Sequence, residues 1–462
     1  MTRCPARWQT EHVIPIVTPA EMGEIDAEAT EPTDVLIGRA GAAVAREALG
    51  IMGGAYGRRV VVLAGKGNNG NDGRCAAGLL ERRGVRTRVI PVEEVASHAD
   101  GMPEADLVID AAFGTGFSGT WEPPRPGSAP VLAVDIPSGI DGLTGEACGS
   151  PWHAVRTVTF AALKPGLVQG DGPGFAGEVV VADIGLDVTR ATSHLVEDHD
   201  VVAWIPPRAS GDHKWRHAVW VVAGSPGMEG AGWLCARAAM RAGAGYVRVG
   251  SPGVPEPTTP REAVGVELPA HGWGSLVAEG ASRFGAVVVG PGIGVWEGVR
   301  AELEALAVAG VTVLLDADAL TALDCSPLPA VASTVRTPHD GEYASLMGRA
   351  PGRDRIAAVR DAARTHGSVV LLKGPTTAVG HPDGRVLVVR SGDERLATAG
   401  TGDVLSGLVG AHLASGAEPL LAAAAGAQLH GLAGCMSGEF GVLAQDVADH
   451  LGVARASLPR VP

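Results

Sequence analysis

The feature that most constrains this chain is a short apolar run that ends in a glycine-rich polar turn and continues into a helical pattern. Arg59–Ala64 (RVVVLA) reads as a buried strand, opens into residues 65–73 (GKGNNGNDG) and is followed by a helical pattern over residues 74–83. Ala218–Ala223 leads in the same way into a turn at residues 224–231 and then into a helix rich in Ala and Arg. Because strands alternate with helices along the chain, we predict an α/β fold built on parallel strands.

The length of the chain predicts two domains. At 462 residues it exceeds what one ordinary hydrophobic core accommodates, and residues 183–213 combine Gly, paired Pro and scattered charge in the manner of a domain boundary. We therefore expect an N-terminal domain at residues 1–205 and a C-terminal domain at residues 206–462.

Composition argues against several function classes. The formal net charge of −14 is spread over many carboxylates, and no run of Lys and Arg forms the basic patch expected of a nucleic-acid binder. The six cysteines include no CxxC pair, no His or Cys stands at zinc-ligand spacing, and no apolar stretch approaches the ~18 residues that cross a membrane. These patterns predict a cytoplasmic protein with neither a membrane nor a nucleic-acid partner.

Polar residues follow the first strand at once. Asn68, Asn69 and Asp72 offer amide and carboxylate oxygens that can hold hydroxyls, a ribose, a cation or the edge of a phosphate. The same residue types are also common in plain turns, because Asn, Asp and Gly tolerate left-handed backbone conformations. Their density directly after a buried strand favours a binding loop.

Two further strands end in similar residues. Leu107–Ile109 leads into Asp110, and Val131–Val134 leads into Asp135 and Ser138. Since the carboxyl ends of parallel strands meet at one edge of a sheet, these side chains and the first loop are expected to converge on one crevice. Hard oxygen ligands without His or Cys suit an alkali or alkaline-earth cation rather than zinc, although each Asp alone would pass for a strand-end cap.

Four segments of this half, in this order, resemble the NAD(P)HX epimerase family: GKGNNGNDG, DAAFGTG, VDIPSGIDGLTG at residues 134–145 and TVTFAALKPGL at residues 157–167. The resemblance implies a Rossmann-like fold, a bound potassium ion, and interconversion of the R and S epimers of hydrated NADH or NADPH. It matches the potassium ligands to Asn69, Asp110 and Ser138, and proton transfer to Asp135. The substrate contacts that it implies are Asn68, Asn69, Gly70, Asn71, Asp72, Gly114, Thr115, Gly116, Phe117, Ser118, Gly119, Thr120 and Asp135.

Two positions depart from that family pattern. Asn71 stands where Gly is usual, and residues 37–41 (IGRAG) stand where a Met-Glu-Asn-Ala-Gly-like segment is usual. The first adds a side chain to the binding loop, and the second removes a carboxylate. The sequence leaves open whether this half turns substrate over or only binds a nucleotide.

In the second half, residues 397–407 (ATAGTGDVLSG) place a polar glycine turn before an amphipathic helix pattern. The amides of Gly400, Thr401 and Gly402 would then lie at a helix N-terminus, where an anion such as a phosphate is favoured. Asp403 adds a carboxylate beside that anion, as a base that takes a proton from a hydroxyl would. A plain helix cap is the other interpretation of Asp403.

Other expected strands of this half also end in polar residues. The strands are expected at residues 246–249, 286–289, 311–315 and 369–372. Polar turns follow Val289 at residues 290–294, Leu315 at 316–320, Val335 at 337–342 and Leu372 at 373–377. Lys373 at a glycine turn after a strand suits an anion, although a single surface Lys is commonly just solvated. His339 is either a helix-start residue or a polar substrate contact.

The glycine turn AGTGD with its helix resembles the phosphoryl-transfer loop of ribokinase-like kinases. The fuller set GSPGMEGA, GPGIG, LDADAL, TPHDGEYASL, LLKGPTT and LATAGTGDVLSG resembles the NAD(P)H-hydrate dehydratase family, which has that fold and uses ADP or ATP to dehydrate NAD(P)HX. The hydrate contacts that this implies are Ala231, Gly294, His339 and Asp403. The implied nucleotide contacts are Lys373, Gly374, Pro375, Thr376, Thr377, Gly400, Thr401 and Gly402.

One segment of this half departs from the family pattern. A Lys-Gly turn usually precedes the first strand, whereas Lys214 is followed here by Trp215, Arg216 and His217. We expect this change to reshape a lid over the site.

Together the two resemblances follow the order of the bifunctional NAD(P)H-hydrate repair enzymes, a lyase joined to an isomerase. They imply two three-layer α/β domains, NADHX and NADPHX as substrates, ADP or ATP as co-substrate, and potassium and magnesium as cofactors. Self-association is left open. The alternative is a ribokinase-like kinase for a small molecule such as a vitamin precursor, with a non-catalytic nucleotide-binding N-terminal domain.

Overall fold

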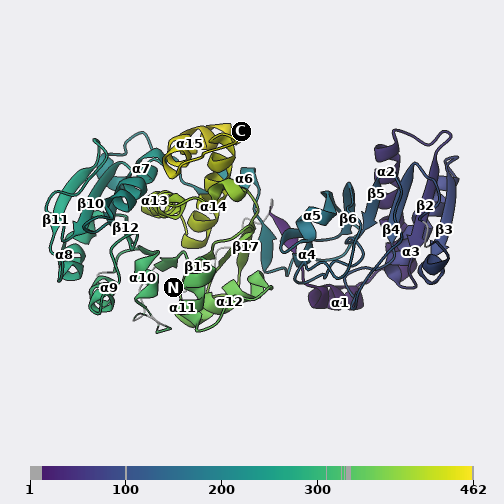
Figure 1. The fold of residues 1–462 in the computed structure, drawn as a ribbon, viewed down its shortest axis with the longest axis horizontal. Coiled ribbons are helices and arrows are strands. Elements are labelled where there is room, and N and C mark those ends of the chain that lie inside the picture. The colour runs from purple at the N-terminus through teal and green to yellow at the C-terminus, as the bar shows by residue number, and fades with distance from the viewer. Residues whose placement is uncertain are drawn as a thin grey trace. The chain divides into compact units, whose positions relative to one another are not determined.

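The computed structural model describes residues 13–459 apart from 99–100, 309, 324, 327 and 329–333. The chain divides into two compact units, one at Ile14–Ser193 and one that includes His194–Pro462. Each unit is built on its own sheet with helices around it, so the predicted α/β class is confirmed (Figure 1). No helix in the described part of the chain is long and apolar enough to cross a membrane.

The N-terminal unit contains a six-stranded parallel sheet in the order β3-β2-β4-β5-β6-β7. Its central strands are buried apolar runs, as strands covered on both faces must be. The strands are β2 (Arg59–Ala64), β3 (Arg86–Pro91), β4 (Leu107–Ala111), β5 (Val131–Val134), β6 (Arg156–Phe160) and β7 (Glu178–Ala182), with a short β1 (Ile14–Ile16) beside residue 163. The helices are α1 (Pro19–Glu28), α2 (Thr33–Met52), α3 (Asn68–Glu81), η1 (Val92–His98), α4 (Pro165–Val168) and α5 (Gly172–Ala176).

Helix α3 begins earlier than the pattern predicts. It starts at Asn68 rather than at residue 74, so the polar residues of GKGNNGNDG occupy its first turns. The glycines allow this because the helix lies directly against the sheet: a Cβ on Gly70 would stand 2.0 Å from the carbonyl oxygen of Gly65, and one on Gly73 would stand 2.5 Å from Cβ of Ala111. The segment is therefore a helix N-terminus pressed onto strand ends rather than an open loop.

The helical pattern of residues 19–50 is also interrupted. It forms two helices, α1 and α2, because Pro32 caps α2 and a residue before proline disfavours the helical conformation. Helix α1 starts at Pro19 behind a capping box between Thr18 and Glu21, which fixes its first turn.

The C-terminal unit contains a mixed sheet in the order β8-β17-β16-β15-β14-β13-β12-β9-β10-β11. Strands β15, β14, β13, β12, β9, β10 and β11 pair in parallel. Strand β16 pairs antiparallel with β15, and β17 pairs antiparallel with β16. The strands are β8 (Ser193–Leu195), β9 (Ala218–Val222), β10 (Tyr246–Pro252), β11 (Val264–Leu268), β12 (Ala286–Val289), β13 (Val313–Leu315), β14 (Thr334–Arg336), β15 (Val369–Leu372), β16 (Thr377–Gly380) and β17 (Val386–Val389).

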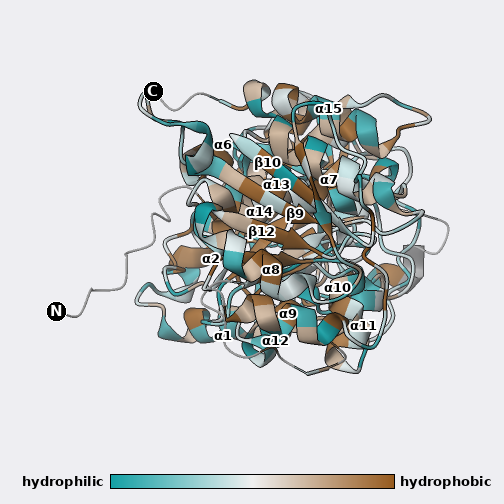
Figure 2. Cartoon of the chain, turned by 90° about the vertical axis from the view of Figure 1, so that its left-hand side faces the viewer, coloured by the Kyte–Doolittle hydropathy of each residue, from teal (hydrophilic) through white to brown (hydrophobic). Residues whose placement is uncertain are grey.

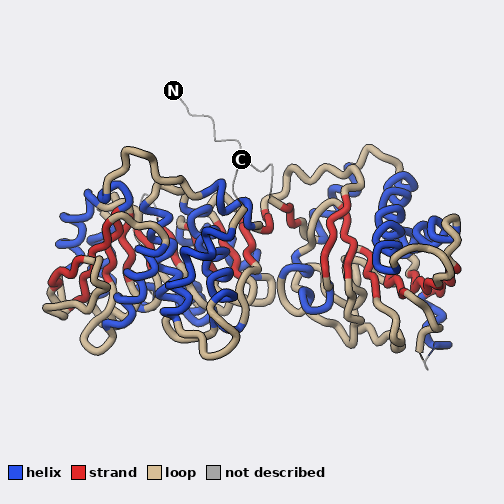
Figure 3. The backbone as a smooth tube through the Cα atoms, turned by 90° about the horizontal axis from the view of Figure 1, so that it is seen from above, coloured by secondary structure: helices blue, strands red, loops and turns tan. Residues whose placement is uncertain are grey.

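Helices pack around this sheet (Figure 3), and the apolar strands β9 and β12 lie among them (Figure 2). The α-helices are α6 (Asp198–Trp204), α7 (Glu229–Arg241), α8 (Trp273–Gly280), α9 (Val299–Ala307), α10 (Asp318–Thr321), α11 (Asp340–Met347), α12 (Arg355–His366), α13 (Thr401–Ala414), α14 (Pro419–Met436) and α15 (Ala444–Ser457). Short 3-10 helices are η2 (Lys214–His217), η3 (Ala281–Arg283) and η4 (Glu394–Leu396).

Helix α6 packs within the C-terminal unit, where Asp198 accepts a hydrogen bond of 2.8 Å from Gln428 of α14. The compact unit therefore includes residues before the expected boundary at 205/206. That boundary between functional domains stays a prediction.

Helix α13 crosses α7 at a glycine, and this contact allows a stability test. A Cβ on Gly407 would stand 2.0 Å from the carbonyl oxygen of Cys235, so Gly407→Ala forces the two helices apart. We expect a loss of about 1–3 kcal/mol in the free energy of unfolding, measured by urea denaturation followed by circular dichroism. The matched control is Gly452→Ala on α15, where nothing lies within 4 Å of the added Cβ. That variant should gain up to about 1 kcal/mol from better helix propensity; equal effects of both variants would contradict the packing argument.

Candidate active sites

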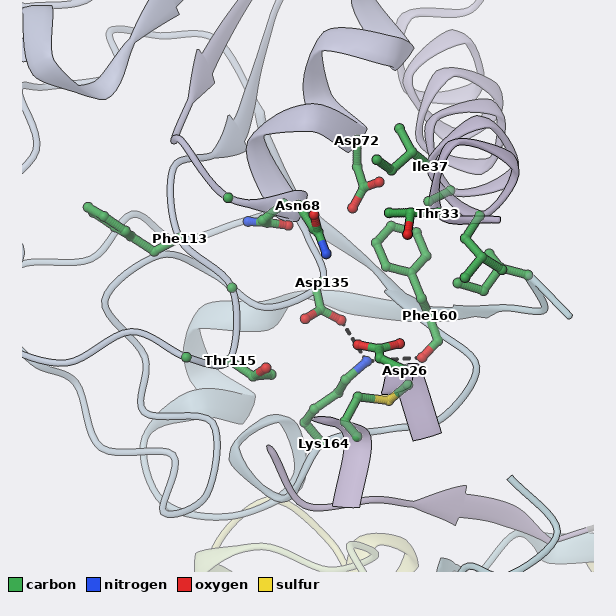
Figure 4. A pocket seen from close by; sticks show the side chains of 18 of the residues that line it. Asp26, Thr33, Ile37, Asn68, Asp72, Phe113, Thr115, Asp135, Phe160 and Lys164 are labelled. Atoms are coloured by element: carbon green, nitrogen blue, oxygen red, sulfur yellow. Dashed lines mark hydrogen bonds and ion pairs between the residues drawn. The ribbon is translucent and has the colours of Figure 1, made fainter. Parts of the chain in front are cut away.

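The N-terminal unit has a cavity of about 720 Å³ at the carboxyl ends of β2, β4, β5 and β6 (Figure 4). The end of each of these strands or the segment that follows it contributes lining residues, as expected for a parallel sheet. The residues of the predicted site that line it are Asn68, Asn69, Asp72, Gly114, Thr115, Gly116, Phe117 and Asp135. Residues that the sequence analysis did not single out also line it, among them Asp26, Thr33, Phe160 and Lys164.

Asp135 is held by a buried ion pair. Its Oδ1 lies 2.6 Å from Nζ of Lys164, whose side chain is only 1% exposed, and Thr159 donates its hydroxyl to the same oxygen at 3.1 Å. Nζ of Lys164 also donates to Thr159 at 2.9 Å and to the carbonyl of Phe160 at 3.0 Å. Asp135 has φ 67°, a strained value for a residue with a side chain. The strained backbone and the ion pair together fix Oδ1 of Asp135. Its Oδ2 lies toward Gly114, where an added Cβ would stand 3.5 Å from it.

The predicted potassium ligands Asp110 and Ser138 are in direct contact. Asp110 is fully buried, and its carboxylate accepts from the hydroxyl of Ser138 at 2.6 Å and from its amide at 2.9 Å. Burial raises the pKa of Asp110, while the hydrogen bonds from Ser138 lower it in part. Asn69 lies nearby across Gly114, and both polar atoms of its side chain are buried with no partner among the described residues. An unsatisfied buried amide beside hard oxygens fits a bound alkali cation or a substrate hydroxyl.

Asp72 lies on the opposite wall of the cavity, on α3 (Figure 4). It is 7% exposed. Burial raises the pKa of Asp72 to about 8, and the negative charges of Asp135 and Asp26 add to the shift. At neutral pH this carboxyl therefore holds its proton.

Five predicted contacts, Gly70, Asn71, Ser118, Gly119 and Thr120, are not among the residues that line the cavity. Asn71 is directed to Arg74, whose Nη1 donates to its Oδ1 at 3.4 Å. The departure at Asn71 therefore leaves the cavity open. At the other departure, the apolar side chain of Ile37 lines the cavity.

In the C-terminal unit, Lys373 at the end of β15 joins two carboxylates. Its Nζ lies 2.9 Å from Oδ1 of Asp316 and 3.4 Å from Oε2 of Glu342. Asp316 also accepts from the hydroxyl of Ser406 on α13 at 2.7 Å. Burial lowers the pKa of Lys373, but the two carboxylates more than offset it and the net shift is upward. Lys373 is therefore a fixed cation at the carboxyl edge of the sheet.

The glycine turn at the start of α13 meets this cluster. Gly400 has φ 91°, a left-handed value that favours glycine, and the helix begins at Thr401. A Cβ on Gly402 would stand 3.6 Å from Nζ of Lys373 and 4.0 Å from Oδ2 of Asp316. The amide of Thr401 donates to the carbonyl of Thr398 at 3.3 Å, so it is not free for a ligand as the sequence predicts. The start of the helix lies beside the Lys373 cation, and a helix N-terminus next to a cation favours a phosphate.

Asp403 stands in the first turn of α13 among other carboxylates. Burial, and after it the negative charge of Asp316, raise the pKa of Asp403 to about 7 against the opposing effect of Lys373. A carboxyl with this pKa is ionised for part of the molecules at neutral pH and can accept a proton there. The predicted base is therefore in a suitable electrostatic setting.

The other predicted hydrate contacts lie in the segments that follow β9, β12 and β14, and Ala231 is in the first turn of α7. Gly294 donates its amide to Asp318 at 2.9 Å, and Ala231 contacts Gly292, where an added Cβ would stand 3.1 Å away. His339 caps α11, its Nδ1 accepting from the amides of Gly341 and Glu342 at 3.0 and 3.1 Å. The helix-start interpretation of His339 is thus observed. Its ring is exposed, and its Nε2 lies 3.4 Å from Oε1 of Glu342.

Two further observations concern residues outside the predicted set. Arg355 donates to the carbonyl of Lys373 at 2.6 Å and pairs with Asp340 at 2.9 Å, so it braces the turn at residues 373–377. In the sequence, only its place at a helix start after Asp354 could have indicated Arg355.

The changed segment Lys214–His217 forms η2 before the first residue of β9, at the amino edge of the sheet. The expectation that it reshapes a lid over the site is wrong, because the site lies at the carboxyl edge.

The two halves of the chain match two families. Residues 219–451 match the family described as NAD(P)H-hydrate dehydratase, and residues 33–98 and 87–166 match the family described as YjeF-related protein N-terminus. Among solved structures, the ADP/ATP-dependent NAD(P)H-hydrate dehydratase from Bacillus subtilis co-crystallized with ATP/Mg2+ aligns with a TM-score of 0.50 at 26% identity, over 57% of this chain and 98% of that one. A ribokinase-like superfamily protein from Enterococcus faecalis aligns with a TM-score of 0.50 at 21% identity, over 59% and 98%. The ribokinase-like fold of the second half is thereby confirmed.

Curated relatives extend over most of the chain. It is 39% identical over 407 residues to the bifunctional NAD(P)H-hydrate repair enzyme Nnr of Mycobacterium tuberculosis, with 81% of this chain and 82% of the relative covered. It is 34% identical over 514 aligned residues to the enzyme of the same name from Moorella thermoacetica, with 94% and 96% covered. The chain therefore belongs to the family of bifunctional NAD(P)H-hydrate repair enzymes.

Proposed function

We propose that the C-terminal unit dehydrates S-NAD(P)HX to NAD(P)H at the expense of ADP or ATP, and that the N-terminal unit interconverts the R and S epimers. The observation that carries the dehydratase proposal is the position of Lys373 and Asp403 beside the glycine turn at the start of α13. The observation that carries the epimerase proposal is the cavity of the N-terminal unit, in which Lys164 orients Asp135.

The dehydration uses the cluster in the following way. The substrate has a hydroxyl on the ring carbon beside the nitrogen, and hydroxide is a poor leaving group. Asp403 takes the hydroxyl proton while the oxygen bonds to the terminal phosphorus of the nucleotide, which releases the shortened nucleotide. The ring nitrogen then expels phosphate, and loss of a proton from the adjacent carbon restores the double bond. Lys373 and the amides of Gly400 and Gly402 stabilise charge on the transferred group.

Magnesium would enter with the nucleotide and offset the charge of its phosphates. The residues that would receive those phosphates are Lys373, Gly374, Pro375, Thr376 and Thr377, with the start of α13. For potassium, Asn69, Asp110 and Ser138 would supply the oxygen ligands in the N-terminal unit. We assign the epimerase to residues 1–205 and the dehydratase to residues 206–462.

Two further parts of the proposal concern the protein as a whole. We propose a cytoplasmic setting, which is supported by the free thiols of the described cysteines Cys75, Cys148, Cys235, Cys325 and Cys435. Self-association of the chain stays a hypothesis that light scattering on the purified protein tests.

The base role of Asp403 predicts a large loss of turnover on substitution. Asp403→Asn should lower the kcat of the dehydratase by about 10²–10⁴-fold, because the hydroxyl proton then has no acceptor. In the wild type, kcat/KM should rise with pH until Asp403 is ionised, near pH 7. Glu279→Gln, an exposed carboxyl on α8, is the matched control. Turnover of Asp403→Asn within a few-fold of wild type would refute the base role, and a stable phosphate ester in place of free phosphate would identify a small-molecule kinase.

The same substitution should stabilise the fold at high pH. Because the pKa of Asp403 is raised from 3.8 to about 7 in the folded state, its ionisation weakens the fold progressively as the pH rises through this range. Asn carries no charge, so Asp403→Asn should unfold at higher temperature than wild type at pH 8, by a gain on the order of 1–4 kcal/mol. The gain should shrink toward pH 4. Calorimetry at both pH values measures it, and a gain that does not change with pH would contradict the electrostatic cause.

The proposed proton transfer by Asp135 predicts a loss of epimerase activity in the N-terminal unit when this residue is substituted. Asp135→Asn should slow conversion of pure R-NADHX to the S epimer by about 10²–10⁴-fold, followed by chromatographic separation of the epimers without nucleotide. The dehydratase rate on S-NADHX should be unchanged, which controls for folding. If Asp135→Asn epimerises as fast as wild type, the assignment fails.

A further inference from the structure

The cavity of the N-terminal unit has more acids than its buried cation can neutralise. Asp135 is paired with Lys164, whereas Asp72 on the facing wall forms no hydrogen bond or ion pair with any described residue although it is 7% exposed (Figure 4). Asp72 is directed into the cavity from the second turn of α3. An unpartnered buried carboxyl that faces a ligand cavity is costly, so a role toward the ligand would explain it.

The charged groups around Asp72 can be named element by element. Helix α1 contributes Asp26 at the exposed rim, the end of β5 contributes Asp135, and the segment after β6 contributes Lys164. Lys66, before α3, is exposed and pairs with Glu93 at 2.8 Å. The part of α2 that lines the cavity contributes Thr33, Leu36, Ile37 and Ala40, which do not ionise. Asp72 therefore faces two carboxylates, and the single buried cation is committed to one of them.

We propose that Asp72 is a second proton-transfer residue of the epimerase and acts from the wall opposite Asp135. The proposal rests on the epimerase function proposed above. The raised pKa of Asp72 agrees with a group that enters the reaction as an acid while Asp135 enters as a carboxylate.

The protonated carboxyl of Asp72 gives its proton to the hydroxyl oxygen on the ring carbon, the carbon–oxygen bond breaks, and the nitrogen lone pair forms a carbon–nitrogen double bond as water leaves. Water then adds to the other face of the same carbon, the double-bond electrons return to nitrogen, and the released proton passes to Asp135. One water leaves and one enters, and one proton moves from Asp72 to Asp135. The reverse sequence converts the product epimer.

The test uses the full-length enzyme and pure R- or S-NADHX in oxygen-18 water without nucleotide. Wild type should epimerise both substrates with incorporation of the label into the ring hydroxyl. Asp72→Asn should lower epimerisation by about 10²–10⁴-fold, yet keep label exchange in the one epimer whose hydroxyl faces Asp135. Asp72→Glu should restore part of the epimerisation. A merely structural role would remove exchange from both epimers together.

Three outcomes overturn the proposal. They are epimerisation by Asp72→Asn within threefold of wild type, equal loss of exchange from both epimers, and wild-type epimerisation without label incorporation. The matched control is Glu81→Gln on the exposed end of the same helix, which should behave as wild type. A wild-type enzyme that does not epimerise at all would instead refute the proposed function of this unit, so the two failures are distinguishable.

Discussion

Both sites depend on the burial of parallel strands on both faces. Such strands have no solvated face on which to carry polar side chains, so the chain can place them only where a strand ends and the next segment begins. In the N-terminal unit the ends of β2, β4, β5 and β6 supply Asn69, Phe113, Asp135 and Lys164 to one cavity. In the C-terminal unit the ends of β13 and β15 supply Asp316 and Lys373, and α13 begins beside them and donates the hydroxyl of Ser406 to Asp316. Residues far apart in the sequence meet because the strands are parallel.

The two sites also share an electrostatic design. Each contains a lysine held by carboxylates: the buried Lys164 is paired with Asp135, and the partly buried Lys373 with Asp316 and Glu342. The carboxyl left over in each site, Asp72 or Asp403, has its pKa raised by burial to about 8 or about 7. An excess of negative charge away from water weakens the fold but provides groups that exchange protons near neutral pH. Family membership and these charges lead to the same account of the chemistry.

The sequence predicts the strands and their polar ends well, and the tertiary contacts poorly. Val131–Val134 and Val369–Leu372 have the bounds that the apolar pattern indicates, because buried strands leave a continuous apolar run. The start of α3 was not predictable, since GKGNNGNDG has the composition of a turn and only contact with β4 shows why its glycines suit a helix. Lys164 was missed because a lysine gives no sign of depth in a sequence, although the motif TVTFAALKPGL contains it. The changed residues before β9 were misjudged because sequence order does not tell which edge of the sheet they occupy.

The most direct test of the central claim incubates the purified enzyme with an equal mixture of R- and S-NADHX, magnesium, potassium, and ADP or ATP. The near-ultraviolet absorbance of reduced nicotinamide is followed to completion. The account predicts recovery only when nucleotide is present, and full rather than half recovery, faster than the epimers interconvert spontaneously. No recovery with either nucleotide would contradict the dehydratase, and recovery that stops at half would contradict the epimerase.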